Sequence, residues 1–324
     1  MHTKVAPTHG PNVSAEPMDV LRAFLRAYWL RPENALWMAL RSQALDGCAI
    51  ARPSLDLSCG DGVFSFIHAG GRFDDDFDVF TSVAALDRVH QEHADMFDYV
   101  GHGYDPVAVR RPEASIDVGT DLKPSLIAKA KRLDFYGQVV EHDNNTPLPF
   151  TDESFQTAYC NSAYWVPKID LFLSELRRVV RSTGRVVLHV KLDSMRAYTL
   201  ARHRDVLGDA FLDTIGRGRI ESWPTLASRS QWESRFARAG LVVEDVSEIA
   251  TRTHSHLWDI GLRPLAPLLA RMANALDIET RRSIKCDWVN LLGGLLQPIC
   301  SRNIDLFGST AEPAELQYLL RPSG

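Results

Sequence analysis

Residues 53–62 read Pro-Ser-Leu-Asp-Leu-Ser-Cys-Gly-Asp-Gly, a short apolar run that changes into small and acidic residues. This pattern predicts a buried strand that ends in a turn and is followed by a helix. A turn built from glycine and serine lets a ligand approach the backbone closely, because few bulky side chains stand in the way. We therefore expect the main ligand of the protein to lie across residues 58–62.

Strands and helices alternate regularly after this turn, which favours a parallel sheet with helices on both faces. The stretch 70–114 separates the turn from this regular part, because no second strand is expected before residue 115. The predicted strands are 53–59, 115–120, 138–143, 155–160, 184–191, 241–249 and 315–321, and the predicted helices are 123–133, 170–181, 194–217 and 232–239, with apolar helices around 262–276 and 288–299.

Polar residues stand at the ends of the first four of these strands. They are the turn 58–62, then Asp121, then Asp143 with Asn144, and finally Asn161. Ligands of doubly wound sheets bind beyond the carboxyl ends of the strands, and a carboxylate can accept hydrogen bonds from both hydroxyls of a ribose. The alternatives are an exposed helix cap for Asp121 and a plain turn residue for Asp143.

Residues 54–190 resemble the class I S-adenosylmethionine-dependent methyltransferases, of the methyltransferase domain type 11 kind. The resemblance rests on residues 55–62, 117–124, 141–155 and 175–185. It implies a Rossmann-like, doubly wound sheet of seven strands, mostly parallel with an antiparallel last strand, and S-adenosylmethionine as the cofactor.

The resemblance also implies roles for single residues. Residues 56–62 would hold the methionine part of the cofactor, Asp121 its ribose, and Asp143 with its neighbour the adenine. The cofactor-binding residues expected on this basis are Asp56, Ser58, Cys59, Gly60, Gly62, Asp121, Leu122, Asp143, Asn144 and Asn161.

Two departures from the family pattern concern chemistry. Ser58 replaces the usual first glycine of the turn, and Tyr164 with Trp165 stands where many relatives have Glu-His. No catalytic residue can therefore be assigned by resemblance. We expect Tyr28, Trp29, Tyr164 and Trp165 to shape the acceptor pocket, with packing in the core as the alternative.

The parts outside the regular pattern divide the chain. We expect a leader at 1–17, a helical lid at 18–52 with two helices meeting near Pro32, a core at 53–250 with an insertion at 70–114, a helical cap at 251–310, and a final strand of the core within 311–324. The insertion holds His90 and His93, and the cap holds His254 and His256; solvated or turn positions are favoured over metal ligation for these histidines, so no metal is expected.

Composition excludes or favours certain classes of partner and cellular surroundings. The 36 basic and 41 acidic residues give a net charge of −5, which argues against a nucleic-acid partner. Five scattered cysteines without Cys-x-x-Cys spacing fit a reducing cytoplasm. No apolar run reaches the roughly 18 residues of a membrane span, although the apolar helices leave peripheral membrane contact open. The sequence does not indicate an oligomeric state.

The expected function is methyl transfer from S-adenosylmethionine to a small-molecule acceptor, such as a natural-product, sugar or lipid-linked intermediate. Ser58 and the Tyr164-Trp165 departure motivate an alternative, a catalytically inactive cofactor-binding module that acts as a structural or regulatory partner. A nicotinamide dehydrogenase fits less well, because the turn lacks Gly-x-Gly-x-x-Gly.

Overall fold

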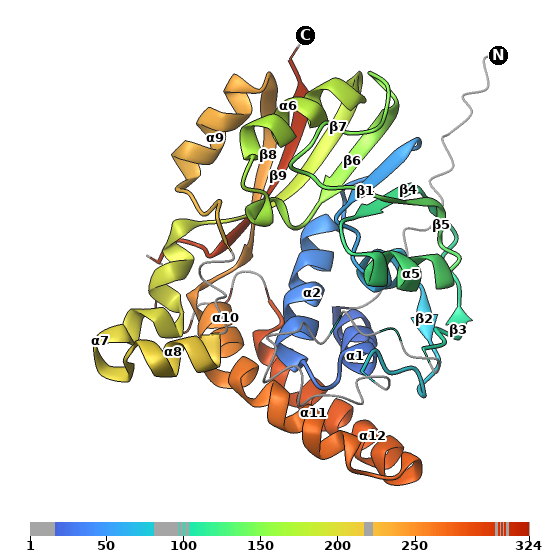
Figure 1. Ribbon diagram of the computed structural model, residues 1–324, viewed down its shortest axis with the longest axis vertical. Helices are drawn as coiled ribbons and strands as arrows, with labels where there is room; N and C mark the ends of the chain where they lie inside the picture. The colour runs from blue at the N-terminus through green and yellow to red at the C-terminus, as the bar shows by residue number, and fades with distance from the viewer. Residues whose placement is uncertain are drawn as a thin grey trace, which may run out of the picture.

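The computed structural model describes residues 17–80, 97, 100, 104–216, 223–301, 304, 306, 308 and 311–323. The expected leader, apart from Pro17, lies outside these residues, as do His90 and His93. Figure 1 shows one twisted sheet in the upper half of the molecule, with α1, α2, α10, α11 and α12 gathered below it.

The sheet has seven strands in the order β5-β4-β1-β6-β7-β9-β8. All neighbouring pairs from β5 to β7 are parallel, whereas β9 is antiparallel to both β7 and β8. This confirms the predicted doubly wound sheet with an antiparallel last strand. The strands are β1 (Ser54–Leu57), β4 (Ile116–Asp121), β5 (Tyr136–Glu141), β6 (Phe155–Cys160), β7 (Val180–Lys191), β8 (Leu241–Ala250) and β9 (Glu315–Pro322).

Strand β1 lies at the point where the winding reverses, between β4 on one side and β6 on the other. All four of its residues are buried. A short strand covered on both faces needs apolar or internally bonded side chains, which explains the run at the start of the turn. The carboxyl end of β1 is therefore the expected ligand edge of the sheet.

Prolines and side-chain caps set several helix starts. Pro32 and Pro124 occupy the first turns of α2 and α5, and Ser228 begins α9 with a capping box. The helices are α1 (Pro17–Ala27), α2 (Pro32–Leu45), α3 (Val63–His68), α5 (Pro124–Arg132), α6 (Ile169–Val179), α7 (Arg204–Leu207), α8 (Asp209–Gly216), α9 (Arg229–Arg238), α10 (Arg252–His256), α11 (Ala266–Asn274) and α12 (Ile278–Leu296), with a π-helix at Leu257–Leu262.

The prediction that no strand precedes residue 115 after the first helix is wrong. Strands β2 (Arg72–Phe73) and β3 (Ala108–Arg110) pair antiparallel in a small sheet of their own. Strands of two and three residues are too short to show an alternating pattern in the sequence. The predicted helical middle of the insertion falls mainly on residues that the structure does not describe.

The stretch 194–217, predicted to be helical, is helical over most of its described residues but is divided into short helices. Two 3₁₀ helices, Asp193–Tyr198 and Leu200–His203, precede the short α7 and α8. Gly208 separates α7 from α8 with φ +75°, a left-handed conformation that ends a helix. The last long helix begins ten residues before the expected 288, because Asp277 caps Thr280 N at 2.9 Å and the first turns of α12 are polar.

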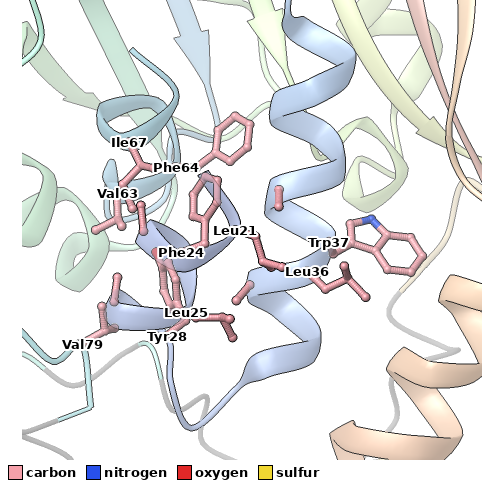
Figure 2. Close-up of a cluster of buried hydrophobic side chains, with 14 of the residues drawn as sticks. Leu21, Phe24, Leu25, Tyr28, Leu36, Trp37, Val63, Phe64, Ile67 and Val79 are labelled. Atoms are coloured by element: carbon pink, nitrogen blue, oxygen red, sulfur yellow. The ribbon is translucent and has the colours of Figure 1, made fainter. Parts of the chain in front are cut away.

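The N-terminal segment forms two helices that meet near Pro32, as predicted, and both pack against the core. Figure 2 shows Phe24 of α1 beside Phe64 of α3, whereas the ring of Trp37 lies on the other side of α2. The rings of Phe24 and Phe64 stack with centroids 5.8 Å apart. Helix α1 is thus part of the main hydrophobic core.

Helix α12 lies against α1 and the start of the insertion. Arg281 forms an ion pair with the buried Asp78 at 2.7 Å, and the Lys285 ammonium donates to the carbonyl of Phe77. The Trp288 indole N–H donates to the carbonyl of Trp29 at 2.9 Å. These contacts join the cap, the lid and the insertion, whose boundaries remain predictions.

Candidate functional site

The turn after β1 has an unusual backbone. Ser58, Gly60 and Gly62 all have positive φ angles, of 55°, 63° and 78°. A Cβ at Gly62 would come within 2.8 Å of Leu133, so this glycine is needed for packing. A Cβ at Gly60 would meet no atom within 4 Å, which leaves that side of the turn open to a ligand.

Asp121 at the end of β4 is joined directly to the turn. Its carboxylate accepts hydrogen bonds from Gly60 N at 3.0 Å and from Lys123 N at 2.9 Å. Burial raises the pKa of this carboxyl group, and the backbone N–H groups oppose the rise. A carboxylate has about four acceptor positions, so acceptor capacity remains for a hydroxyl group of a ligand.

Asn144 reaches the same turn from beyond β5. Its amide Nδ2 donates to Ser58 Oγ at 2.9 Å. Within the described part of the chain, Asn144 Oδ1 is buried without a hydrogen-bond partner, and so are His142 Nε2 and Thr120 Oγ1. Unsatisfied buried polar atoms are costly, and three of them at one edge of the sheet indicate a place for a polar ligand.

Asp56 lies one layer deeper than the turn. It is 2% exposed and accepts hydrogen bonds from Ser65 Oγ at 2.6 Å and Tyr136 OH at 2.8 Å. Burial raises its pKa to about 6. Asp56 therefore ties α3 and β5 to the turn, and contact of its carboxylate with a ligand stays a prediction.

Asp61 connects the turn to the N-terminal helices. Tyr28 OH lies 3.0 Å from both of its carboxylate oxygens, and Val63 N donates to Oδ1 at 3.1 Å. Burial raises the pKa of Asp61. Cys59, its neighbour in the turn, is also buried, and its N–H donates to the carbonyl of Thr120 at 2.8 Å.

Other predicted cofactor residues are placed less directly. The Asp143 carboxylate accepts from the backbone and side chain of Asn145, and the first of these bonds lowers its pKa most. Asn144, rather than Asp143, thus makes the contact with the turn. Leu122 is 57% exposed, and Asn161 is partly exposed beyond the end of β6.

Residues 100–188 match the family model described as a methyltransferase domain. The chain carries a class I methyltransferase domain. Its cofactor is S-adenosylmethionine. No curated protein matches the sequence.

Solved structures with a similar fold include three from different organisms. A Thermotoga maritima S-adenosylmethionine-dependent methyltransferase is 13% identical, with 68% of this chain and 79% of that chain covered and a TM-score of 0.43. A candidate Bacillus halodurans methyltransferase is 14% identical, with 87% and 98% covered and a TM-score of 0.43. A candidate sarcosine dimethylglycine methyltransferase from Galdieria sulphuraria is 16% identical, with 95% and 91% covered and a TM-score of 0.45. Similarity at this level carries no information about the acceptor.

The residues of the methyltransferase domain fit the cofactor. The open side of Gly60 can receive a ligand, Asp121 retains acceptor capacity, and Asn144 offers an unused amide oxygen. These groups belong to three neighbouring strands whose carboxyl ends share one edge. A sugar hydroxyl and a base amine are the kinds of groups that such acceptors bind.

The four aromatic residues predicted for the acceptor pocket lie in different surroundings. Tyr28 reaches the turn through Asp61, whereas Trp29 is buried and donates to Asp78 at 2.8 Å. Tyr164 is 7% exposed and accepts from Arg41 Nη2 at 3.3 Å, and Trp165 is 40% exposed. Binding of an acceptor by these residues stays a prediction.

Sequence reasoning missed a buried group of charges beside Tyr164. Lys191 ends β7 and faces Glu315, the first residue of β9, at 3.2 Å. The signal was present, because a lysine closes an otherwise apolar strand and an acid opens the strand predicted to pair with it. The sequence alone does not show that these two residues are buried together, because they meet only in the folded chain.

The described residues show neither a metal-binding cluster nor a membrane-spanning helix. Among the described residues, no group of three or more His, Cys, Asp or Glu side chains is arranged to hold a metal ion. His254 is buried, and its ring nitrogens lie 2.9 Å from Ile299 O and 3.0 Å from Thr251 N. None of the described helices is long and apolar enough to cross a membrane.

Proposed function

We propose that this methyltransferase transfers the methyl group of S-adenosylmethionine to a small-molecule acceptor. The observation that carries the proposal is the meeting of the turn, Asp121 and Asn144 at one edge of the sheet, within hydrogen-bond distance of one another. The protein needs no acid or base to activate the donor, because the sulfonium cofactor supplies an already activated methyl group when it is bound. The tasks left to the protein are to position both partners and to exclude water.

The side chains around the turn suit the methionine end of the cofactor. Asp56, Asp61 and Asp121 surround the turn, and their negative charge would favour a cation there. Asp121 would accept hydrogen bonds from the ribose, and Asn144 would accept one from the adenine amine. Leu122 would lie beside the ribose as an apolar contact.

The acceptor is expected beyond Asn161 and Tyr164, on the side of the sheet edge that leads toward β7. The natural-product, sugar and lipid-linked classes predicted from the sequence stay the proposed acceptors. An inactive cofactor-binding module would share the same turn, so activity distinguishes the two.

The test is methyl transfer from S-adenosylmethionine carrying a labelled methyl group to a pool of small-molecule acceptors. Labelled product and S-adenosylhomocysteine are expected from the wild type and absent with Asp121→Ala. Tight cofactor binding without product from any acceptor pool would favour the inactive module.

A further inference from the structure

A buried lysine at the end of β7 is enclosed by aromatic rings. Lys191 is 3% exposed, and its ammonium lies 4.0 Å from the ring centre of Trp37 and 4.9 Å from that of Tyr164. The rings of Trp223 and Trp258 follow at 5.6 Å and 5.9 Å. Rings at these distances attract a cation. We call Lys191 with these four rings the lysine box.

The residues of the lysine box come from regions of the chain that have no part in the proposed cofactor site. Trp37 comes from α2 of the predicted lid, Tyr164 follows β6, and Trp258 belongs to the π-helix of the predicted cap. Figure 2 shows Trp37 leaving α2 on the side opposite to the α1 cluster. Because β6 and β7 are parallel neighbours, the box lies at the same sheet edge as Asn161.

The charges in this region do not balance. Glu315 is fully buried and accepts from Lys191 Nζ at 3.2 Å, from Arg41 Nε at 2.8 Å and from the indole N–H of Trp37. The Glu315 carboxylate is thus the counter-charge for two cations, Lys191 and Arg41. Burial and the Arg41 charge lower the pKa of His189, the next polar residue on this face of β7, to about 3, so its imidazole is neutral and leaves the charge of this group unchanged.

The buried acid of the π-helix that carries Trp258 is already paired. Asp259 binds Arg263 at 2.6 Å, so that pair is neutral as a whole. With Lys191 protonated, Lys191, Arg41 and Glu315 together carry one excess positive charge. Burial lowers the pKa of the Lys191 ammonium, which is the expected response of a buried cation that shares its only carboxylate. A buried charge without a counter-charge is unfavourable, and an anion beside the two cations would remove the imbalance.

Lys191 also has unused donor capacity. An ammonium group has three N–H donors, and among the described residues Lys191 makes a hydrogen bond only to Glu315. The aromatic rings compensate its charge in part, but they are weaker partners than an oxygen atom. Arg41 contributes a second cation to the same side and reaches Tyr164 OH at 3.3 Å.

We propose that Lys191 and Arg41 bind an acidic oxygen group of the methyl acceptor, so the acceptor is a small organic anion with an apolar or aromatic body. This rests on the proposed function, because it names the substrate class of that same sheet edge. The ammonium donates to the anionic oxygen, and the rings of the lysine box contact the apolar part. The anion restores the charge balance around Glu315.

The test compares small probes that differ in charge and little else. Benzoate and phenyl phosphate are titrated against the wild type by ligand-detected NMR, with neutral benzamide as the matched probe. At least one anion is expected to bind about tenfold or more tightly than benzamide. Equal affinities, tighter binding of benzamide, or no binding of any probe would overturn the proposal; a preference for only one anion tells carboxylate from phosphate.

Variants of Lys191 test whether this side chain causes the preference for anionic probes. Lys191→Met removes the charge at similar volume and is expected to abolish the preference, whereas Lys191→Arg retains part of it. Lys285→Met is the matched control, since Lys285 is also buried but bonds to the carbonyls of Asp75 and Phe77. A preference that survives Lys191→Met would contradict the proposal, and if that variant does not fold, the wild-type comparison decides.

Cofactor binding separates this proposal from the one on which it rests. The titrations are run with and without S-adenosylhomocysteine, whose own binding is measured by calorimetry. Failure of S-adenosylhomocysteine to bind the wild type counts against the proposed function, and the probe preference remains measurable. Normal S-adenosylhomocysteine binding with no preference for anions overturns only the anionic acceptor.

Discussion

Ser58 shows how a single residue adapts the turn. A serine with φ 55° is strained relative to glycine, since its Cβ crowds the backbone in the left-handed region. The strain is offset by the hydrogen bond that Asn144 donates to Ser58 Oγ. The serine thereby holds in place the side chain expected to contact the adenine, a contact that glycine cannot make.

Substitutions at Ser58 should separate strain from contact. Ser58→Gly removes the strain and the hydrogen bond together, so the free energy of unfolding should change by less than about 1 kcal/mol. Ser58→Val places a β-branched side chain in the left-handed region and should destabilise by about 2 kcal/mol or more. Urea denaturation measures both, and equal effects of the two variants would contradict this account of the turn.

Asp121 carries the clearest prediction for cofactor binding. Asp121→Ala removes the carboxylate that faces Gly60 N and is placed for the ribose hydroxyls. The dissociation constant for S-adenosylhomocysteine should rise by about 10- to 100-fold, which corresponds to charged hydrogen bonds of 1.5–3 kcal/mol. Calorimetry checks this, with Asp245→Ala on the exposed part of β8 as the control, which should bind like the wild type.

Asp56 predicts a pH dependence of stability. Burial raises its pKa from 3.8 to about 6 in the folded protein, so folding favours the protonated acid. As the pH rises from about 4 to about 6, the free energy of unfolding should therefore fall. This group should contribute about 3 kcal/mol to the fall. Asp56→Asn lacks the titration, so its stability relative to the wild type should improve across this window. A constant difference in urea denaturation at pH 4, 5, 6 and 7 would show that Asp56 does not titrate as described.

At the scale of elements, the strand ends were predictable and their fine structure was not. Asp121, Asn144 and Asn161 follow apolar runs, and parallel strands bring such ends to one edge. Strands β2 and β3 escaped prediction because two or three residues show no period. The breaks at Thr199 and Gly208 were missed because the apolar positions on both sides still recur at helical spacing.

The contact of Tyr28 with Asp61 links two elements. It joins the segment after α1 to the ligand turn, and it makes the N-terminal helices part of the site. The sequence predicts that Tyr28 helps to shape the acceptor pocket, with packing in the core as the alternative. The structure gives it a defined partner in the turn itself.

Tyr28→Phe should loosen this link. Loss of a buried hydrogen bond to a carboxyl group should lower the free energy of unfolding by about 1–3 kcal/mol and weaken S-adenosylhomocysteine binding several-fold. Tyr198→Phe is the control, because Tyr198 OH bonds a backbone carbonyl of Glu312 at an exposed site. If both variants lose stability and affinity equally, the Tyr28 contact has no special role.

At the scale of the whole molecule, the site has two halves with different origins. The cofactor half is built from short motifs at successive strand ends, so residues close in sequence carry its chemistry. The half assigned to the acceptor depends on Trp37, Lys191 and Glu315, which are far apart in the chain and meet only after α2 packs on β7 and β9. Sequence patterns describe local periodicity, and therefore the second half could not be read from them.

The most direct test of this account is calorimetric titration of the wild type with S-adenosylmethionine. The arrangement of the turn, Asp121 and Asn144 predicts a single site per chain with a dissociation constant in the range of about 1–100 μM. It also predicts that S-adenosylhomocysteine competes for that site. Absence of binding of either compound to folded protein would contradict the central claim that this sheet edge holds the methyl donor.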